Sequence, residues 1–318
     1  MAATLRLRSG VLGLAAAAYG AASVLLAHRF TNQRDNPGIR LIDRSPSDEG
    51  LPFEDVAFAA DADGLTISGW LIPQTDGATA VVLVPAGGHN RLNRPLDQLG
   101  LVRGQLRLAR ALWERGRTVL LYDPRGTGRS QGVRLSYGFL EARDLVGALR
   151  CLEGRGFPPE RVGVLGWSMG AATAMFALEK VRYAGLVADS PLAGFALDEI
   201  ARYAARQLGL PLPLAKGATA VMTSGVFAAA RFLWGIDLRA QPADALRQHP
   251  VPTVVIHGRA DSQVPVRAGQ RMAVAAGDAL LDAHFLEGVE HVAAYAADPA
   301  WYVETVCRAL DRMLGGER

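Results

Sequence analysis

The sequence predicts an α/β fold with a mostly parallel central sheet that carries helices on both faces. Short apolar runs alternate with longer segments in which leucines recur at helical spacing, and this alternation is typical of strand–helix–strand units. Several of the runs are wholly apolar, as expected for parallel strands that are covered on both faces. At 318 residues the chain is long enough to bury a substantial core, as one large domain or two small ones.

The predicted elements follow one another from residue 51 to the C-terminus. Two strands open the domain, and the turn Asp61-Ala62-Asp63-Gly64 between them indicates a hairpin. The predicted strands are 56–59, 65–72, 80–84, 118–122, 162–165, 184–188, 253–256 and 283–286. The predicted helices are 101–112, 140–152, 171–178 and 301–314.

Residues 191–250 interrupt this alternation. A segment of this length without a strand is expected to have a structure of its own, such as a lid or cap, and its apolar residues recur at helical spacing. We therefore predict a helical cap insertion, 191–250, within a domain that spans 51–318. Phe227 and Trp234 in this insertion are candidate substrate-binding residues, because ligand pockets are lined mainly by apolar and aromatic side chains.

The N-terminus, residues 1–30, is predicted to be a separate piece. Arg6 and Arg8 precede the uncharged, alanine-rich run 9–27, whose length suits a single helix across a bilayer. We expect a single-pass transmembrane or signal-anchor helix, with the side of the membrane left open by the flanking charges. A cleaved signal peptide fits the same pattern, and a docked soluble helix is a third interpretation. The polar residues 31–50 are predicted to form a linker.

The composition narrows the classes of function. Half of the residues are apolar and a fifth are charged, as in globular proteins. The net charge is +3, and the arginines are scattered among apolar positions, so we expect no nucleic-acid partner. Cys151 and Cys307 have no metal-ligand spacing, which predicts no metal site. The glycines of Gly126-Thr127-Gly128 do not open a helix directly, so this sequence does not indicate a dinucleotide cofactor.

A candidate nucleophile lies in Gly166-Trp167-Ser168-Met169-Gly170, which matches G-x-S-x-G between an apolar strand and a small-residue helix. In a tight strand-to-helix turn the flanking glycines let neighbouring backbone pass close, and the turn exposes the serine hydroxyl. The helix N-terminus directs backbone N–H groups to the place where negative charge develops. This setting, more than the five residues alone, makes Ser168 the predicted nucleophile.

A serine hydroxyl needs a general base that a third group holds in place. Asp261 and His291 each end a loop that follows a predicted strand, so both are expected at the same sheet edge as Ser168. Asp189, at the end of an earlier strand, is the alternative acid. His257 and His284 fall within or at the end of strands, where roles in the core fit better than that of general base.

Four motifs in one order carry a family resemblance. They are Asp123-Pro124-Arg125-Gly126-Thr127-Gly128-Arg129-Ser130, the segment from Gly166 to Gly170, the segment from Ile256 to Pro265, and the segment from Gly288 to His291. The sequence resembles the α/β-hydrolase superfamily, in its lipase, esterase and serine-aminopeptidase-like branch, from about residue 51 to the C-terminus. This resemblance implies an α/β-hydrolase fold and a hydrolase that needs no cofactor.

The resemblance also implies the groups that bind the oxyanion. They are the N–H groups of the residue after the nucleophile, Met169, and of a residue beyond the third strand, Gly87. Because Pro85-Ala86 stands where the family has a His-Gly pair, Gly88 is the alternative second donor. His89 beside this loop and Trp167 before the nucleophile are further candidate substrate-binding residues.

The expected reaction is acyl transfer to water. Ser168 attacks the carbonyl of an ester, His291 accepts the serine proton, and Asp261 fixes the tautomer of the imidazole. We expect a small-molecule or lipid-like acyl ester as substrate. A peptidase, thioesterase or acyltransferase with the same triad is one alternative, and a non-catalytic, membrane-tethered binding module is another, since a fold does not fix a function.

Overall fold

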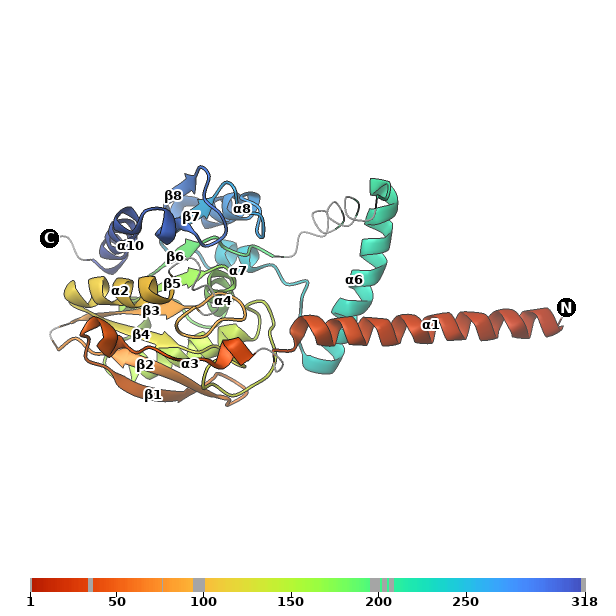
Figure 1. Cartoon of the computed structure of the whole chain (residues 1–318), viewed down its shortest axis with the longest axis horizontal. Helices are drawn as coiled ribbons and strands as arrows, with labels where there is room; N and C mark the ends of the chain where they lie inside the picture. The colour runs from red at the N-terminus through yellow and green to blue at the C-terminus, as the bar shows by residue number, and fades with distance from the viewer. Residues whose placement is uncertain are drawn as a thin grey trace. The chain divides into compact units, whose positions relative to one another are not determined.

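The described residues form an eight-stranded sheet in the order β1-β2-β4-β3-β5-β6-β7-β8 (Figure 1). The computed structural model describes residues 2–33, 37–75, 77–93, 101–194, 201, 205 and 209–315. The strands are β1 (Glu54–Ala59), β2 (Thr66–Ile72), β3 (Thr79–Val84), β4 (Arg117–Tyr122), β5 (Val162–Trp167), β6 (Gly185–Asp189), β7 (Thr253–Gly258) and β8 (Leu280–Leu286).

The sheet is mixed, with its antiparallel part at one edge. β1 pairs with β2 and β2 pairs with β4 in antiparallel register. The predicted hairpin is confirmed, because the Ala60 N–H donates to the Leu65 carbonyl across the turn, at 2.9 Å. Every pairing from β4 to β8 is parallel. Residues in β3, β4, β5, β6 and β7 are almost all buried, which explains why the middle of each strand is an apolar run.

Helices cover both faces of this sheet. α2 (Leu101–Glu114), α9 (Ala294–Ala297) and α10 (Pro299–Leu314) contact one another on one face, as Figure 1 shows for α2 and α10. α3 (Glu141–Glu153), α4 (Met169–Ala177), α7 (Pro242–Gln248) and α8 (Arg267–Ala276) form a contacting series on the other. A core between sheet and helices includes Leu83, Leu112, Leu165, Ile256 and Leu310. The fold therefore aligns the carboxyl ends of β5 to β8 along one edge, where open α/β sheets place their sites.

From residue 33 onward the predicted linker belongs to the larger unit, which comprises residues 33–194 and 241–318. It contains two short 3-10 helices, Pro37–Arg40 and Pro46–Glu49. The Asp48 carboxylate accepts a hydrogen bond from the Ser45 N–H at 2.9 Å, and Gly50 ends the second helix in a left-handed conformation.

A smaller unit comprises residues 1–32 and 195–240. It contains α1 (Ala2–Thr31) and α6 (Leu212–Trp234), which pack against each other. The Tyr19 hydroxyl donates to the Val221 carbonyl and lies 3.2 Å from the Ser224 hydroxyl. A Cβ on Gly225 would lie 2.2 Å from the Ser23 hydroxyl, so this glycine permits the close approach of the two helices.

The structure corrects the predicted transmembrane segment. In the part of the chain that the structure describes, no helix combines the length and the apolar character that crossing a membrane requires. The run 9–27 is mostly alanine and glycine, whose transfer into hydrocarbon contributes little free energy, and α1 ends with His28 and Arg29 in its last turn. The prediction of a membrane-spanning N-terminal helix is therefore wrong, and this finding gives no support to a membrane as partner through it.

Candidate active site

The turn between β5 and α4 holds Ser168 in an unusual backbone conformation. Its φ is 52° and its ψ is −111°, a region that non-glycine residues rarely adopt. A Cβ on Gly166 would lie 2.5 Å from the Ala171 nitrogen, and one on Gly170 would lie 2.2 Å from the Val84 carbonyl oxygen. The two glycines of the motif are thus required by the packing of the turn. Ser168 itself is half-buried, although its neighbours in the turn are buried.

His291 and Asp261 lie in line with this serine. The Nε2 atom of His291 is 3.0 Å from the Ser168 Oγ, and its Nδ1 atom is 2.7 Å from the Asp261 Oδ2. His291 follows β8 and Asp261 follows β7, so three strand ends contribute one residue each. Both side chains are almost fully buried, which strengthens the electrostatic interaction between them.

The carboxylate of Asp261 receives hydrogen bonds from four directions. Its Oδ1 accepts from the N–H groups of Gln263 and Val264, at 3.0 Å and 2.7 Å. Its Oδ2 lies 3.2 Å from the Nε2 of His257, in addition to its contact with His291. Burial alone would raise the pKa of Asp261, but the hydrogen bonds from His257 and His291 outweigh burial and hold that pKa well below its usual range. Asp261 is therefore ionised and fixed in orientation.

His257 is a buried residue whose contact with the acid was not predicted. It lies in β7 with its side chain fully buried, and its Nε2 also lies 2.9 Å from the Val264 carbonyl oxygen. Its Nδ1 has no partner among the described residues, so the proton belongs on Nε2, where it faces two acceptors. A Cβ on Gly269 of α8 would lie 2.6 Å from Nδ1, and this glycine makes room for the ring. The i, i+4 spacing of His257 and Asp261 was the signal available in the sequence.

The loop after β3 contains the two candidates for the second oxyanion donor, Gly87 and Gly88. The Ala86 N–H donates to the Asn93 Oδ1 at 2.9 Å, and the His89 N–H donates to the Ala86 carbonyl at 3.2 Å. Of the two candidate glycines between them, Gly87 lies beside the nucleophile turn, since a Cβ built on it would be 3.2 Å from the Met169 Cβ. Gly88 has a φ of 71°, and a Cβ built on it would lie 4.0 Å from Ile39.

His89 is a neutral imidazole close to His291. Burial and, to a smaller extent, the nearby His291 lower the pKa of His89 to about 4, although hydrogen bonds to the Ala86 and Gly87 carbonyls act in the opposite direction. At pH 7 this side chain therefore carries no charge. Its Nδ1 is buried and has no hydrogen-bond partner among the described residues.

An ion pair with no solvent exposure holds the same loop against the rest of the sheet. The Asp123 carboxylate accepts from the Arg91 N–H, Nε and Nη2 at 2.9, 3.0 and 2.7 Å. It also accepts from the Arg129 N–H at 2.8 Å. Both side chains of the pair are 0% exposed. Asp123 opens the D-x-R-G-x-G-x-S motif, and this motif therefore anchors the loop that contains Gly87.

Asp189, the alternative acid, has other partners. Its Oδ2 accepts from the Tyr302 hydroxyl at 2.9 Å and its Oδ1 from the Ser190 hydroxyl at 3.0 Å. The residue before the nucleophile, Trp167, is 1% exposed and donates its indole N–H to the Tyr302 hydroxyl at 2.9 Å. The indole is a core side chain, and its burial argues against the predicted contact of Trp167 with substrate. Strand β5 is covered on both faces, so either orientation of residue 167 leads into the core.

Phe227 and Trp234, the candidate contacts in the predicted cap, both lie on α6 of the smaller unit. Both side chains are half-buried. The Trp234 ring lies 6.1 Å from the ring of His28 on α1, measured between centroids. Residues 195–200, 202–204 and 206–208 of the predicted cap lie outside the described residues. Contact of Phe227 and Trp234 with a substrate stays a prediction.

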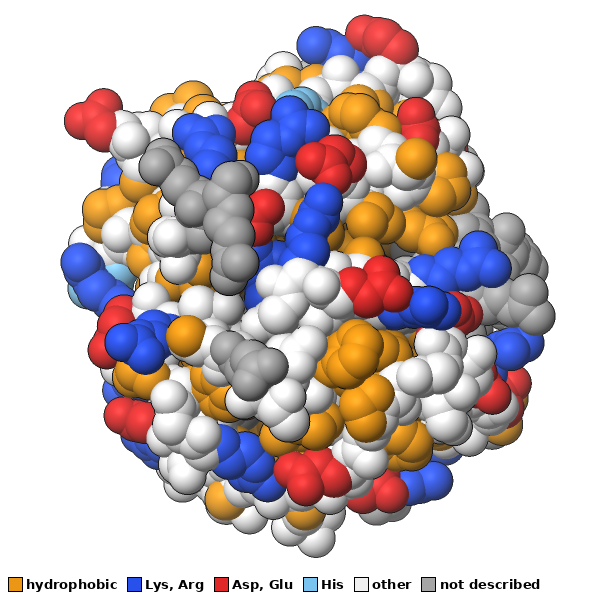
Figure 2. Space-filling view, turned by 90° about the vertical axis from the view of Figure 1, so that its left-hand side faces the viewer, with side chains coloured by type: hydrophobic (Ala, Val, Ile, Leu, Met, Phe, Trp, Pro, Cys, Tyr) orange, Lys and Arg blue, Asp and Glu red, His pale blue; other side chains and the backbone are white. Residues whose placement is uncertain are grey.

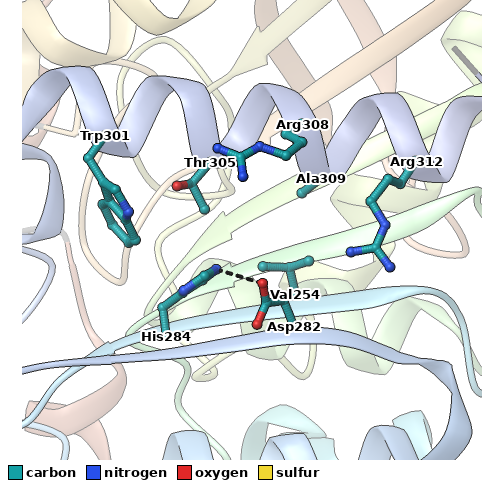
Figure 3. A pocket seen from close by; sticks show the side chains of 8 residues that line it. All are labelled: Val254, Asp282, His284, Trp301, Thr305, Arg308, Ala309 and Arg312. Carbon is teal, nitrogen blue, oxygen red and sulfur yellow. Dashed lines mark ion pairs between the residues drawn. The ribbon is translucent and has the colours of Figure 1, made fainter. Parts of the chain in front are cut away.

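A separate small pocket lies between β8 and α10 (Figure 3). Its volume is about 70 Å³, and Ser168, Asp261 and His291 are not among the residues that line it. His284 and Asp282 face each other there at 3.3 Å, and the His284 ring meets Trp301 edge to face. His284 is thus outside the candidate active site. On the molecular face in Figure 2, basic and acidic side chains are interspersed.

Comparison with known proteins agrees with this fold. The model of the α/β-hydrolase family matches residues 81–305, and the chain belongs to this family. A curated relative, the uncharacterized protein YqkD of Bacillus subtilis, is 28% identical over 265 residues, which cover 79% of this chain and 77% of the relative. A polyketide transferase from a Penicillium species is 39% identical over 82 residues, or 26% of this chain and 24% of that protein.

Solved structures share the fold at low sequence identity. An esterase of Pyrococcus furiosus superposes with a TM-score of 0.64 at 23% identity, covering 86% of this chain and 96% of the esterase. An esterase from a Rhodococcus species superposes with a TM-score of 0.55 at 21% identity, covering 81% of this chain and 99% of that chain. At these identities the likeness concerns the fold.

Proposed function

We propose that this protein is a serine hydrolase that cleaves a carboxylic ester through an acyl-enzyme on Ser168. The observation that carries the proposal is the hydrogen-bonded line from Ser168 Oγ through His291 to Asp261, at 3.0 Å and 2.7 Å. A nucleophile within hydrogen-bond reach of a base, with the base oriented by a third group, is the arrangement that activates a serine hydroxyl. The esterases among the similar structures supply the choice of ester over other acyl groups.

The proposed mechanism follows from the direction of these hydrogen bonds. In the neutral tautomer His291 donates its Nδ1 proton to Asp261, which leaves Nε2 free to accept the proton of the Ser168 hydroxyl. Serine attack on the carbonyl makes a tetrahedral oxyanion, and the imidazolium is stabilised by the ionised Asp261. His291 then protonates the leaving alcohol, and the same base activates water to release the acid from the serine.

The oxyanion is bound, in this proposal, by the N–H groups of Met169 and Gly87. Met169 is the first residue of α4, so its N–H has no partner within the helix. Gly87 is favoured over Gly88 because its position next to Met169 lets two N–H groups converge on one oxygen. His89 beside them is neutral at pH 7, and an uncharged imidazole can contact an ester without adding charge to the site.

A fluorophosphonate probe tests the proposal, because it reacts covalently with activated serines. The wild-type chain is expected to be labelled and to hydrolyse 4-nitrophenyl esters, whereas Ser168→Ala loses both activities by several orders of magnitude and keeps its thermal stability. Ser47→Ala, which removes an exposed hydroxyl from the larger unit, is the matched control and stays active. Labelling that persists in Ser168→Ala refutes the assignment of the nucleophile.

Substrate choice within the acyl class is tested with the same enzyme. A series of 4-nitrophenyl esters from acetate to dodecanoate, alongside a matched thioester and an aminoacyl amide, reports kcat/KM for each bond type. Higher kcat/KM for the ester than for the thioester and amide of equal chain length supports the proposal. Faster amide or thioester cleavage transfers the chain to the peptidase or thioesterase class.

A further inference from the structure

The carboxylate of Asp189 lies behind the candidate active site and takes no part in the proposed reaction. Asp189 ends β6 and is 0% exposed. Its backbone carbonyl accepts a hydrogen bond from the Ser168 N–H at 2.8 Å. Its two carboxylate oxygens accept one hydrogen bond each, from the hydroxyls of Tyr302 and Ser190.

From this carboxylate, two hydrogen-bonded arms reach the neighbours of the nucleophile and the base. Along the first arm, the Tyr302 hydroxyl accepts the indole N–H of Trp167, the residue directly before Ser168, at 2.9 Å. Along the second, the Ser190 hydroxyl accepts the N–H of Val292, the residue directly after His291, at 3.0 Å. A continuous buried chain of hydrogen bonds therefore joins the turn of the nucleophile to the loop of the base.

The chain meets three residues that have strained backbones. Ser168, Ser190 and Val292 have φ angles of 52°, 49° and 55°, and a positive φ is a true outlier for a β-branched valine. Such conformations are unfavourable in free energy and persist only where the surroundings fix them. Ser190 and Val292 belong to this network, and the Ser168 N–H donates to the backbone carbonyl of Asp189. The network is thus placed where the backbone would otherwise relax.

The cost of this carboxylate argues that stability alone does not explain it. Burial raises the pKa of Asp189 to about 6, and the hydrogen bonds from Tyr302 and Ser190 offset only part of the effect. A buried charge that is penalised in this way is weak support for a stabilising role, because well-packed apolar side chains often serve stability better. A role in geometry accounts for both the burial and the full set of partners.

We propose that Asp189 is a positioning residue that fixes the turns of Ser168 and His291 relative to each other and so keeps the serine hydroxyl within reach of the imidazole. Tyr302 and Ser190 act through the same carboxylate. The inference rests on the proposed function, since it concerns the alignment of the proposed nucleophile and base. A misplacement of 1 Å can cost about 100-fold in rate, so small relaxation of either turn is sufficient to lower turnover.

The test compares turnover per labelled site in single and double variants. Tyr302→Phe and Ser190→Ala each remove one oxygen, and we expect kcat per fluorophosphonate-labelled site to fall about 10-fold with KM within about twofold of wild type. In the double variant kcat falls by less than the product of the two single effects, because both hydroxyls act through one carboxylate. Asp189→Leu lowers kcat more than Asp189→Asn does, because the asparagine retains one oxygen for the Tyr302 hydroxyl and so preserves part of the rate.

Tyr122→Phe is the matched control. Tyr122 is also fully buried, but its hydroxyl has no partner among the described residues, so its removal leaves kcat unchanged. If Tyr302→Phe and Asp189→Asn change only thermal stability and retain wild-type kcat per labelled site, the positioning role is overturned and the proposed function stands. If the wild-type chain takes no label at Ser168, both the function and the inference fail.

Discussion

The buried pair of Arg91 and Asp123 leads to a quantitative prediction about the loop that contains Gly87. In Asp123→Ala, the Arg91 guanidinium stays at a site that is 0% exposed and loses its two hydrogen bonds to the carboxylate, and the Arg91 backbone N–H loses a third. Breaking a buried pair by removing one partner costs about 3–5 kcal/mol. The contacts of Arg91 with the Ser68 hydroxyl at 2.7 Å and with the Trp70 ring at 4.6 Å remain, and they place the expected loss near the lower value.

The assay is urea unfolding at 25 °C, followed by tryptophan fluorescence. A loss of about 3 kcal/mol corresponds to about a 100-fold change in the ratio of folded to unfolded protein, and domains have only about 5–15 kcal/mol in total. Arg110→Ala, which breaks an ion pair whose two side chains are 52% exposed, is the control and changes stability by less than about 1 kcal/mol. A loss below about 1 kcal/mol in Asp123→Ala refutes the reasoning.

The remaining predictions concern the hydrogen bonds of Asp261, the choice of substrate and the pH dependence of stability. Asp261→Asn lowers kcat by about 10⁴-fold through the wrong imidazole tautomer, more than any variant of Asp189, and the reverse ranking would exchange their roles. His257→Leu removes a donor to Asp261, so it lowers kcat more than His257→Gln, which retains a donor; equal rates contradict this. Phe227→Ala changes the preferred acyl length more than it changes acetate turnover, and an unaltered length profile refutes the predicted contact. Because the pKa of Asp189 is raised from 3.8 to about 6, its contribution to the free energy of unfolding is present below pH 4 and is lost as the pH rises through 6. Asp189→Asn removes this contribution to the pH dependence of the free energy of unfolding, which urea unfolding measures between pH 4 and 7. A pH dependence equal to that of the wild type contradicts the raised pKa.

The strand and helix alternation was predictable because each element has a local pattern. Apolar runs became the buried parallel strands. β8 begins at Leu280, before the predicted start at 283, because the exposed Asp282 interrupts its apolar run. Ser168, Asp261 and His291 were predictable for a similar reason. Each follows a strand in the sequence, and parallel strands bring their carboxyl ends to one edge.

The groups that hold Ser168, His291 and Asp261 in place could not be predicted in this way. Arg91 and Asp123 are 32 residues apart, and Tyr302 and Asp189 are 113 apart, so no local pattern pairs them. The burial of Trp167 follows from a strand that is covered on both faces and has no outward side, which its sequence position alone does not reveal. The N-terminal run was misjudged because length and absence of charge were weighed above the small contribution of alanine.

The position of β8 at the edge of the sheet has a consequence for the order in which activity is lost. Among the described strands β8 pairs with β7 alone, and the loop after β8 places His291 beside a serine 123 residues earlier in the chain. Such a long-range contact forms late in folding, and edge elements open before the centre of a sheet. Activity should therefore appear in the last step of folding. In mild denaturant it should be lost while the amide hydrogens of the central strands are still protected from exchange.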